Sequence, residues 1–269
     1  MKNPKSLRIA ITGANGFVGK NVRSYLSKNN IILSAIARKN FQNFKFETKI
    51  VTDNLDRKDL ASKLKKFDAL IHLIGIGRQT HDNYFEKINV ELTKKILVLC
   101  KKANIKKIVY ISGLGVSNKT TSAYFISKYR AEQEIIKSKL DYTILRASYI
   151  IGSNDPLIKN LKKQIKNKKI IIPGSGKYYL QPIYVEDVAR IMLLAITSKK
   201  FTNKIIDLVG PQKITFTDFV SMFTNRKNIK IENMDLEKAY HKALLDSHYM
   251  YGIEDLNIMR SEERRVGKE

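Results

Sequence analysis

The stretch Thr12-Gly-Ala-Asn-Gly-Phe-Val-Gly19 decides the fold, because it joins a short apolar run, Leu7–Thr12, to a helical pattern. Its three glycines are spaced three residues apart, and each has a mechanical task in a strand-to-helix turn. Gly13 permits the tight turn off the strand, Gly16 lets the backbone approach an anion, and Gly19 lets the helix pack close to the sheet. Between a first strand and a first helix, these glycines predict a pyrophosphate-binding turn.

The backbone of this turn is expected to supply the contacts to the anion. The N–H groups of Asn15, Gly16 and Phe17 lie at the start of the helix, where the helix dipole also favours negative charge. The expected contact residues of the turn are Gly13, Ala14, Asn15, Gly16, Phe17 and Gly19.

Strand and helix patterns alternate from the turn to Arg146. Further apolar runs typical of strands occupy 31–37, 49–52, 69–74, 107–112 and 142–145, and helical patterns near 56–66, 83–103 and 121–139 separate the later ones. This alternation predicts an α/β fold with a Rossmann-type, doubly wound parallel sheet.

The alternation of strand and helix patterns changes after Arg146, so we expect three parts. Residues 1–146 would form the nucleotide-binding domain, 147–259 a small C-terminal substrate cap that shares its core, and 260–269 a disordered tail. The tail is almost entirely charged and lacks an apolar period. It is also the part least expected to belong to the native sequence.

Composition excludes several classes of protein. Hydrophobic residues make up 43% of the 269 residues, enough for a packed core, and the apolar runs are too short to cross a bilayer. The single cysteine, Cys100, and four unpaired histidines imply no disulfide framework and no metal site. With no apolar signal segment at the N-terminus, we expect a soluble, cytoplasmic protein.

The formal net charge of +25 has two interpretations. Lysines are spread along the whole chain, which favours a compositional bias that fills exposed positions with lysine. The alternative is attraction to an anionic membrane surface. No nucleic-acid partner is expected, because the chain has no reading motif and no basic stripe interleaved with aromatic residues.

The fingerprint Thr-Gly-Ala-x-Gly-Phe-x-Gly resembles that of the extended and atypical branches of the short-chain dehydrogenase/reductase superfamily, which includes epimerase/dehydratase-like enzymes. The resemblance extends over about residues 7–220. It implies adenine contacts from Asp53 and Asn54, a cofactor-lining role for Leu73 within His72-Leu-Ile-Gly75, and a cofactor-side role for Asn89.

Within the superfamily, the chain is most similar to the dinucleotide-binding accessory subunit of respiratory complex I and its prokaryotic relatives. The stretches that carry this similarity are Ser112–Gly115, Gln181–Ala189 and Leu208–Pro211. It implies a respiratory complex as an alternative partner and a location peripheral to a membrane.

The end of the second strand bears on the choice of nicotinamide cofactor. NAD-binding proteins usually place Asp or Glu there to hold the ribose hydroxyls. Here Ala37 occupies that place and Arg38 follows, so a 2′-phosphate would meet a guanidinium instead of a carboxylate. This favours NADP, with NAD as the alternative; the weaker interpretation of Arg38 is one more surface cation in a cationic chain.

Tyr124 and Lys128 are the candidate catalytic pair. Residues four apart share a helix face, and a nearby ammonium favours the phenolate, so Tyr124 could exchange a proton with a substrate oxygen. In the family, this lysine also holds the nicotinamide ribose. Ser112 is the third candidate, but, depending on register, Gly113 or Leu114 takes the place of the family's Ser or Thr; losing this donor would weaken oxyanion stabilisation.

Two functions remain open. The first is an NADP-dependent oxidoreductase or epimerase acting on a small metabolite with a hydroxyl or carbonyl group, or on a nucleotide sugar. The alternative is a cofactor-binding subunit with little turnover in a complex I-like membrane assembly. The intact Tyr124 and Lys128 favour the first, whereas the uncertain Ser112 favours the second.

Overall fold

The computed structural model describes residues 7–224, 228–246 and 248–266. The chain divides into two compact units, of which the first runs to Ala147 and resumes over Tyr184–Leu208, and the second comprises Ser148–Ile183 and the chain from Val209 onward. The return of 184–208 to the first unit differs from the simple boundary expected after Arg146. It occurs because one further strand joins the first unit's sheet and the helix before it packs on that sheet.

The first unit is built on a seven-stranded parallel sheet in the order β11-β6-β5-β4-β1-β2-β3, as expected for a Rossmann-type fold. The strands are β1 (Arg8–Thr12), β2 (Ile32–Ala37), β3 (Glu47–Val51), β4 (Ala69–His72), β5 (Lys107–Gly113), β6 (Asp141–Ala147) and β11 (Lys204–Leu208). The inner strand β1 pairs Ile11 with Ala35 of β2 on one side and with Ile71 of β4 on the other.

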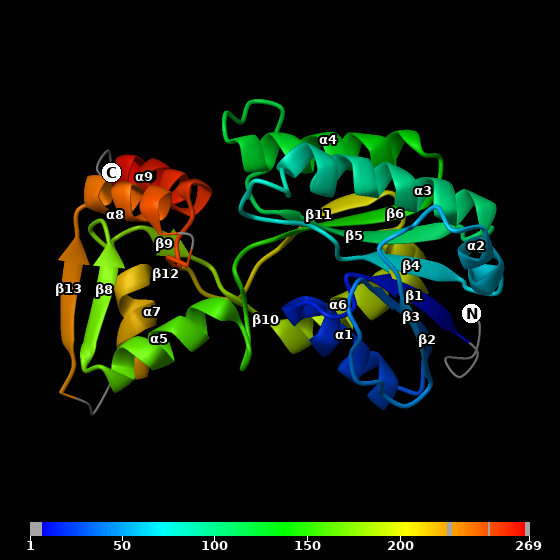
Figure 1. Ribbon diagram of the computed structural model, residues 1–269, viewed down its shortest axis with the longest axis horizontal. Helices are drawn as coiled ribbons and strands as arrows, with labels where there is room; N and C mark the ends of the chain where they lie inside the picture. The colour runs from blue at the N-terminus through cyan, green and yellow to red at the C-terminus, as the bar shows by residue number, and fades with distance from the viewer. Residues whose placement is uncertain (1–6, 225–227, 247, 267–269) are drawn as a thin grey trace. The chain divides into compact units, whose positions relative to one another are not determined.

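Helices cover both faces of this sheet (Figure 1). They are α1 (Phe17–Lys28), α2 (Lys58–Leu64), η2 (Glu86–Glu91), α3 (Leu92–Lys102), α4 (Ala123–Lys137), α6 (Val185–Thr197) and the short turn η3 (Lys199–Phe201). In Figure 1, α3 and α4 lie on one face and α1 and α6 on the other. The inner strands are therefore buried on both sides, which explains their apolar runs.

The second unit has its own apolar core. Its helices are α5 (Pro156–Lys166), α7 (Phe216–Thr224), α8 (Leu236–Leu245) and α9 (Ile253–Val266), and its strands are β7 (Ile150–Ile151), β8 (Lys169–Pro173), β9 (Tyr179–Leu180), β12 (Ile214–Thr215) and β13 (Lys230–Met234); β10 (Ile183–Tyr184) lies at the boundary. The core includes Phe216, Phe219 and Tyr178, whose rings stack.

The tail expected to be disordered from residue 260 is helical in α9 as far as Val266, so the expectation was wrong over 260–266. Leu256 and Met259 of this helix pack on the core of the second unit, which charge composition alone did not reveal. Residues 267–269 lie outside the described part of the chain.

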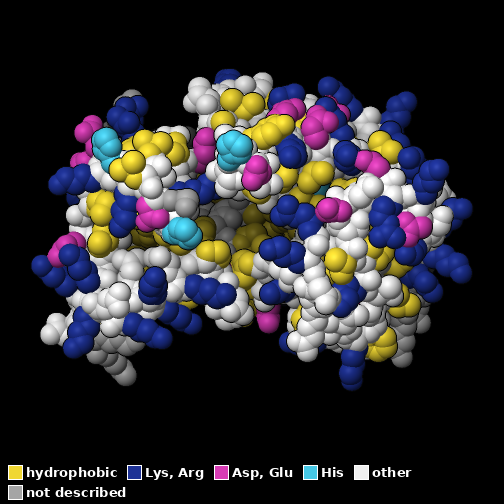
Figure 2. Space-filling view, viewed as in Figure 1, with side chains coloured by type: hydrophobic (Ala, Val, Ile, Leu, Met, Phe, Trp, Pro, Cys, Tyr) yellow, Lys and Arg dark blue, Asp and Glu magenta, His cyan; other side chains and the backbone are white. Residues whose placement is uncertain are grey.

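Lysine and arginine side chains are spread over the face shown in Figure 2 and are interleaved with acidic and neutral ones. Within the described residues, no helix combines the length and apolar character needed to cross a bilayer.

Candidate functional site

The glycine turn is locked between the first helix and the end of β4. Gly13 has φ +70°, and a Cβ added there would lie 2.8 Å from both the carbonyl carbon and the oxygen of Leu73. A Cβ at Gly19 would collide with the Gly13 carbonyl oxygen. The turn therefore requires glycine at both positions, as the sequence predicted on mechanical grounds.

The amides of the turn divide into two groups. The Gly16 N–H donates to the Gly13 oxygen at 3.0 Å and so closes the turn itself. This differs from the expectation that the Gly16 amide faces the anion. The first N–H groups of a helix have no acceptor within it, so those of Phe17, Val18 and Gly19 retain the capacity to bind an anion.

His72 ties the β4 end of the site to the rest of the sheet. Its ring nitrogens lie 2.8 Å from Thr12 Oγ1 and 3.0 Å from Thr93 Oγ1, and the side chain is fully buried. Burial lowers the pKa of His72 to about 3, with a smaller contribution from the Lys128 charge. The ring is therefore neutral and acts as a structural link beside Leu73, whose N–H donates to the Thr12 oxygen at 3.2 Å.

The ends of β2 and β3 carry the residues expected at the adenosine side. Arg38 is exposed immediately after β2, and the Thr52 N–H donates to the Ala37 oxygen at 2.9 Å. The Asn54 N–H donates to Thr52 Oγ1 at 3.1 Å, which folds the chain back around the exposed Asp53. These residues thus lie at the carboxyl ends of two adjacent strands.

Lys128 is buried beneath the candidate catalytic surface. Its Nζ donates to the Ile111 oxygen at 2.7 Å and lies 4.3 Å from the centroid of the Tyr110 ring. Burial lowers the pKa of Lys128 to about 7, against the opposing effect of the nearby Glu132 carboxylate. The ammonium is therefore poised to lose its proton near neutral pH.

Asn89 connects the loop after β4 to helix α4. It lies in η2, a wide π-helical turn, and is fully buried. Its amide exchanges two hydrogen bonds with the Ile76 backbone, at 2.9 and 3.1 Å, and donates to Ser127 Oγ at 2.9 Å. Ser127 Oγ in turn donates to the Tyr124 carbonyl at 2.7 Å. Sequence reasoning missed Ser127, although it directly precedes Lys128.

At the end of β5, Gly113 faces the tyrosine. A Cβ added to Gly113 would lie 3.5 Å from Tyr124 Oη and 3.2 Å from Phe125 Cε1. Ser112 is buried instead, and its Oγ has no hydrogen-bond partner among the described residues. A glycine therefore faces the Tyr124 phenol where the family's Ser or Thr was expected.

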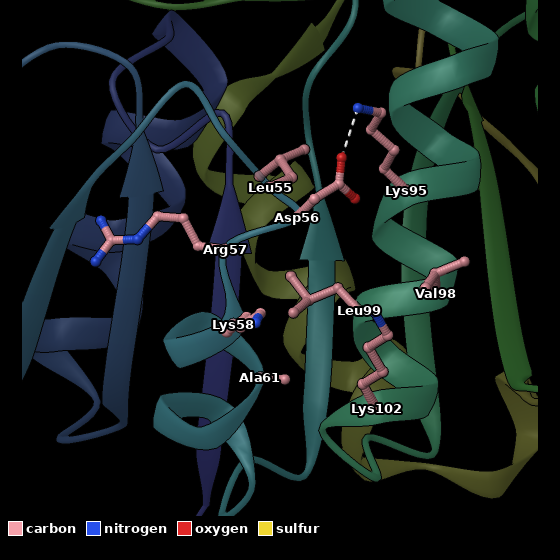
Figure 3. A pocket seen from close by; sticks show the side chains of 9 residues that line it. All are labelled: Leu55, Asp56, Arg57, Lys58, Ala61, Lys95, Val98, Leu99 and Lys102. Carbon is pink, nitrogen blue, oxygen red and sulfur yellow. Dashed lines mark hydrogen bonds and ion pairs between the residues drawn. The ribbon is translucent and has the colours of Figure 1, made fainter.

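A separate pocket of about 210 Å³ opens between α2 and α3 (Figure 3). Its lining residues are Leu55, Asp56, Arg57, Lys58, Ala61, Lys95, Val98, Leu99 and Lys102. Lys95 Nζ lies 2.6 Å from Asp56 Oδ2, so part of its positive charge is neutralised. None of the residues predicted for the site lines this pocket.

The remaining candidate groups are the Cys100 thiol and the side chains that could bind a metal ion. Cys100 is buried, and burial raises the pKa of its thiol to about 12, so the thiol is unreactive. Within the described ranges, no three His, Cys, Asp or Glu side chains are grouped to hold a metal ion.

Comparison with known proteins identifies the family of the chain. The sequence model of the NAD dependent epimerase/dehydratase family matches residues 9–208. A putative UDP-glucose 4-epimerase of Methanocaldococcus jannaschii is 30% identical over 234 residues, which cover 74% of this chain and 76% of that protein.

A second relative has a different description. The mitochondrial NADH dehydrogenase [ubiquinone] 1 alpha subcomplex subunit 9 of Arabidopsis thaliana is 26% identical over 166 residues, covering 61% of this chain and only 41% of that subunit. The chain thus matches less than half of this relative's length.

Among solved structures, MoeE5 in complex with UDP-glucuronic acid and NAD superposes with a TM-score of 0.75 at 20% identity, covering 85% of each chain. The UDP-N-acetylglucosamine 4-epimerase of Methanobrevibacter ruminantium superposes with a TM-score of 0.74 at 21% identity, covering 86% of each chain. At these identities, the structural likeness shows the fold.

Proposed function

The chain belongs to the NAD dependent epimerase/dehydratase family, and from this premise we propose that it binds a nicotinamide dinucleotide and uses Tyr124 and Lys128 in hydride-transfer chemistry. The substrate class we propose is a small metabolite with a hydroxyl or carbonyl group, with a nucleotide sugar favoured by the epimerase relative and by the ligands of the similar structures. The second unit would then act as the substrate cap.

The residues of the glycine turn fit a dinucleotide. Gly13 and Gly19 let the turn pack closely against Leu73 and against itself, and the first N–H groups of α1 beside it have no acceptor within the helix. Leu73 and Asn89 border the same edge of the sheet, because the β4 backbone packs against Gly13 and the Asn89 amide holds Ile76. When bound, the nicotinamide supplies the hydride-accepting or hydride-donating centre.

The chain's own residues supply the proton chemistry. Tyr124 and Lys128 lie one helical turn apart on α4, and the Tyr124 hydroxyl is near Gly113. In the proposed reaction, Tyr124 takes the proton from a substrate hydroxyl or returns it to a carbonyl, while the buried Lys128 ammonium stabilises the phenolate and holds the ribose. The observation that carries this proposal is the placement of Tyr124 and the buried Lys128 beside the end of β5.

The test is the variant Tyr124→Phe, which keeps the ring and removes the transferable proton. We expect it to retain cofactor binding and to lose turnover by a factor of about 10² or more. Tyr129→Phe on the same helix is a matched control, because it removes a phenol outside the proposed site. Equal turnover in wild type and Tyr124→Phe would contradict the assigned role.

For the cofactor, we propose a preference for NADP. The support is Ala37 at the position where a carboxylate would repel a 2′-phosphate, together with the exposed Arg38 that follows it. NAD remains the alternative, because it is the cofactor in the similar MoeE5 structure. Titration with NADPH and NADH tests the preference: Arg38→Ala should weaken NADPH binding about tenfold and spare NADH, whereas Lys39→Ala should change both little.

A low-turnover role as an accessory subunit at a membrane-bound respiratory assembly is the second candidate. It is favoured by the glycine facing Tyr124, which removes a hydrogen-bond donor from the reacting oxygen, and by the mitochondrial subunit relative. Cofactor binding without turnover on a broad panel of carbonyl compounds and sugar nucleotides would support it, as would salt-sensitive co-sedimentation with anionic vesicles. Turnover abolished by Tyr124→Phe would exclude it.

A further inference from the structure

We infer that Arg23 is a positioning residue for the adenosine half of the cofactor, because its guanidinium holds the glycine turn and the β2–β3 loop in one arrangement. This inference rests on the proposed cofactor binding. Arg23 lies on the buried side of α1 and contacts the backbone of the glycine turn from within the protein.

The contacts of Arg23 converge from three segments. Its Nη1 donates to the Ala14 oxygen at 3.0 Å, and its Nη2 donates to the Gln42 oxygen at 2.8 Å. Nε and Nη2 donate to the two carboxylate oxygens of Glu47 at 2.7 and 2.6 Å. One side chain thereby joins the glycine turn, the β2–β3 loop and the first residue of β3.

Aromatic rings complete this arrangement. The Arg23 guanidinium carbon lies 4.2 Å from the centroid of Phe41 and 5.0 Å from that of Phe44, both in the loop that follows Arg38. Such contacts suit the flat, delocalised guanidinium and would be poorly reproduced by a lysine. The loop that carries the proposed phosphate-binding cation is therefore folded around Arg23.

Stability alone does not account for a charge in this place. The side chains of Arg23 and Glu47 are 1% and 0% exposed, so both ions have lost their hydration. Buried ion pairs often contribute no more stability than apolar residues of similar volume, although loss of one partner is costly. What the forked pair provides is a fixed direction for each group that it contacts.

The bond to Ala14 has a direct consequence for the anion site. The Ala14 carbonyl and the Asn15 N–H belong to one planar trans peptide and point in opposite directions. With the carbonyl held by Arg23, the Asn15 N–H is directed to the other side of that peptide, and the donor on the carbonyl polarises it. Arg23 thus aims and strengthens a turn amide without touching the cofactor.

The experiment compares Arg23→Lys with Arg57→Lys in the full-length chain. Arg57 also forms a two-bond fork with a carboxylate, that of Asp59, but lies outside the proposed site, so it controls for loss of a fork as such. Titration with NADH, 5′-AMP and nicotinamide mononucleotide should show about tenfold weaker binding of the first two to Arg23→Lys and unchanged binding of the third. Arg57→Lys should bind all three as wild type does.

A purely structural role would give a different pattern. It would lower the melting temperature of Arg23→Lys and leave the affinity of the folded protein for 5′-AMP unchanged, which would overturn the inference. If Arg23→Lys fails to fold, Phe41→Leu removes the ring over the guanidinium from a loop position and should weaken 5′-AMP about threefold; unchanged affinity there would also overturn it. Absence of NADH binding to the wild type would instead refute the proposed function.

Discussion

Replacing Gly13 by alanine tests the glycine turn on stability alone. The residue has φ +70°, a left-handed conformation that costs an alanine about 1–2 kcal/mol. The new Cβ would also lie 2.8 Å from two backbone atoms of Leu73, which cannot move as a flexible side chain would. Overpacking of this kind costs about 1–3 kcal/mol, so the sum is a loss of about 2–5 kcal/mol in the free energy of unfolding.

The matched control is Gly77→Ala. A Cβ at Gly77 meets no atom within 4 Å, so this variant should change the free energy of unfolding by less than about 1 kcal/mol. Urea unfolding followed by circular dichroism measures both variants against the wild type, with the slope of the transition checked for constancy. Gly13→Ala as stable as Gly77→Ala would refute the conclusion that the turn is locked against β4.

Three further predictions concern the site around Tyr124. Burial lowers the pKa of Lys128 from 10.5 to about 7, so between these pH values the folded state binds fewer protons than the unfolded state, and this residue makes the free energy of unfolding rise with pH. Lys128→Met should lose that part of the rise when urea unfolding is measured from about pH 7 to 10. Parallel wild-type and variant profiles would contradict this prediction. Asn89→Ala leaves the buried Ser127 hydroxyl and the Ile76 backbone without their amide partner, so it should lower the free energy of unfolding by about 2–4 kcal/mol. The control Asn118→Ala, at an exposed position, should lower it by less than about 0.5 kcal/mol. Gly113→Ser would add a hydroxyl near Tyr124 Oη, with the Phe125 ring moving by a few tenths of an ångström to make room, and should raise turnover of a carbonyl substrate about tenfold. Turnover at or below the wild-type level would show that the missing hydrogen-bond donor does not limit the reaction rate.

The parts of the fold that could be predicted depend on neighbours in sequence. The glycine spacing and the apolar runs located the turn and the strand–helix alternation, because a tight turn and a buried parallel strand each impose a local pattern. The expected helix at 121–139 is α4 at Ala123–Lys137, and it carries Tyr124 and Lys128 as foreseen.

The rest depended on contacts between distant segments. Asn89 was assigned through a family resemblance, but its bonds to Ile76 and Ser127 arise only when η2, the loop after β4 and α4 meet. Arg23 resembled any other cation on a helix, because its partner Glu47 lies 24 residues away. The place of β11 in the sheet could not be predicted from the sequence either, because residues 148–183 of the second unit separate it in the chain from its partner strand β6.

The most direct test of the account is a titration of the wild-type protein with NADH and NADPH, followed by the fluorescence of the reduced nicotinamide. We expect saturable binding at one site per chain, lost in Gly13→Ala variants that remain folded and retained in Tyr124→Phe. Absence of saturable binding of either dinucleotide to the folded wild-type chain would contradict it.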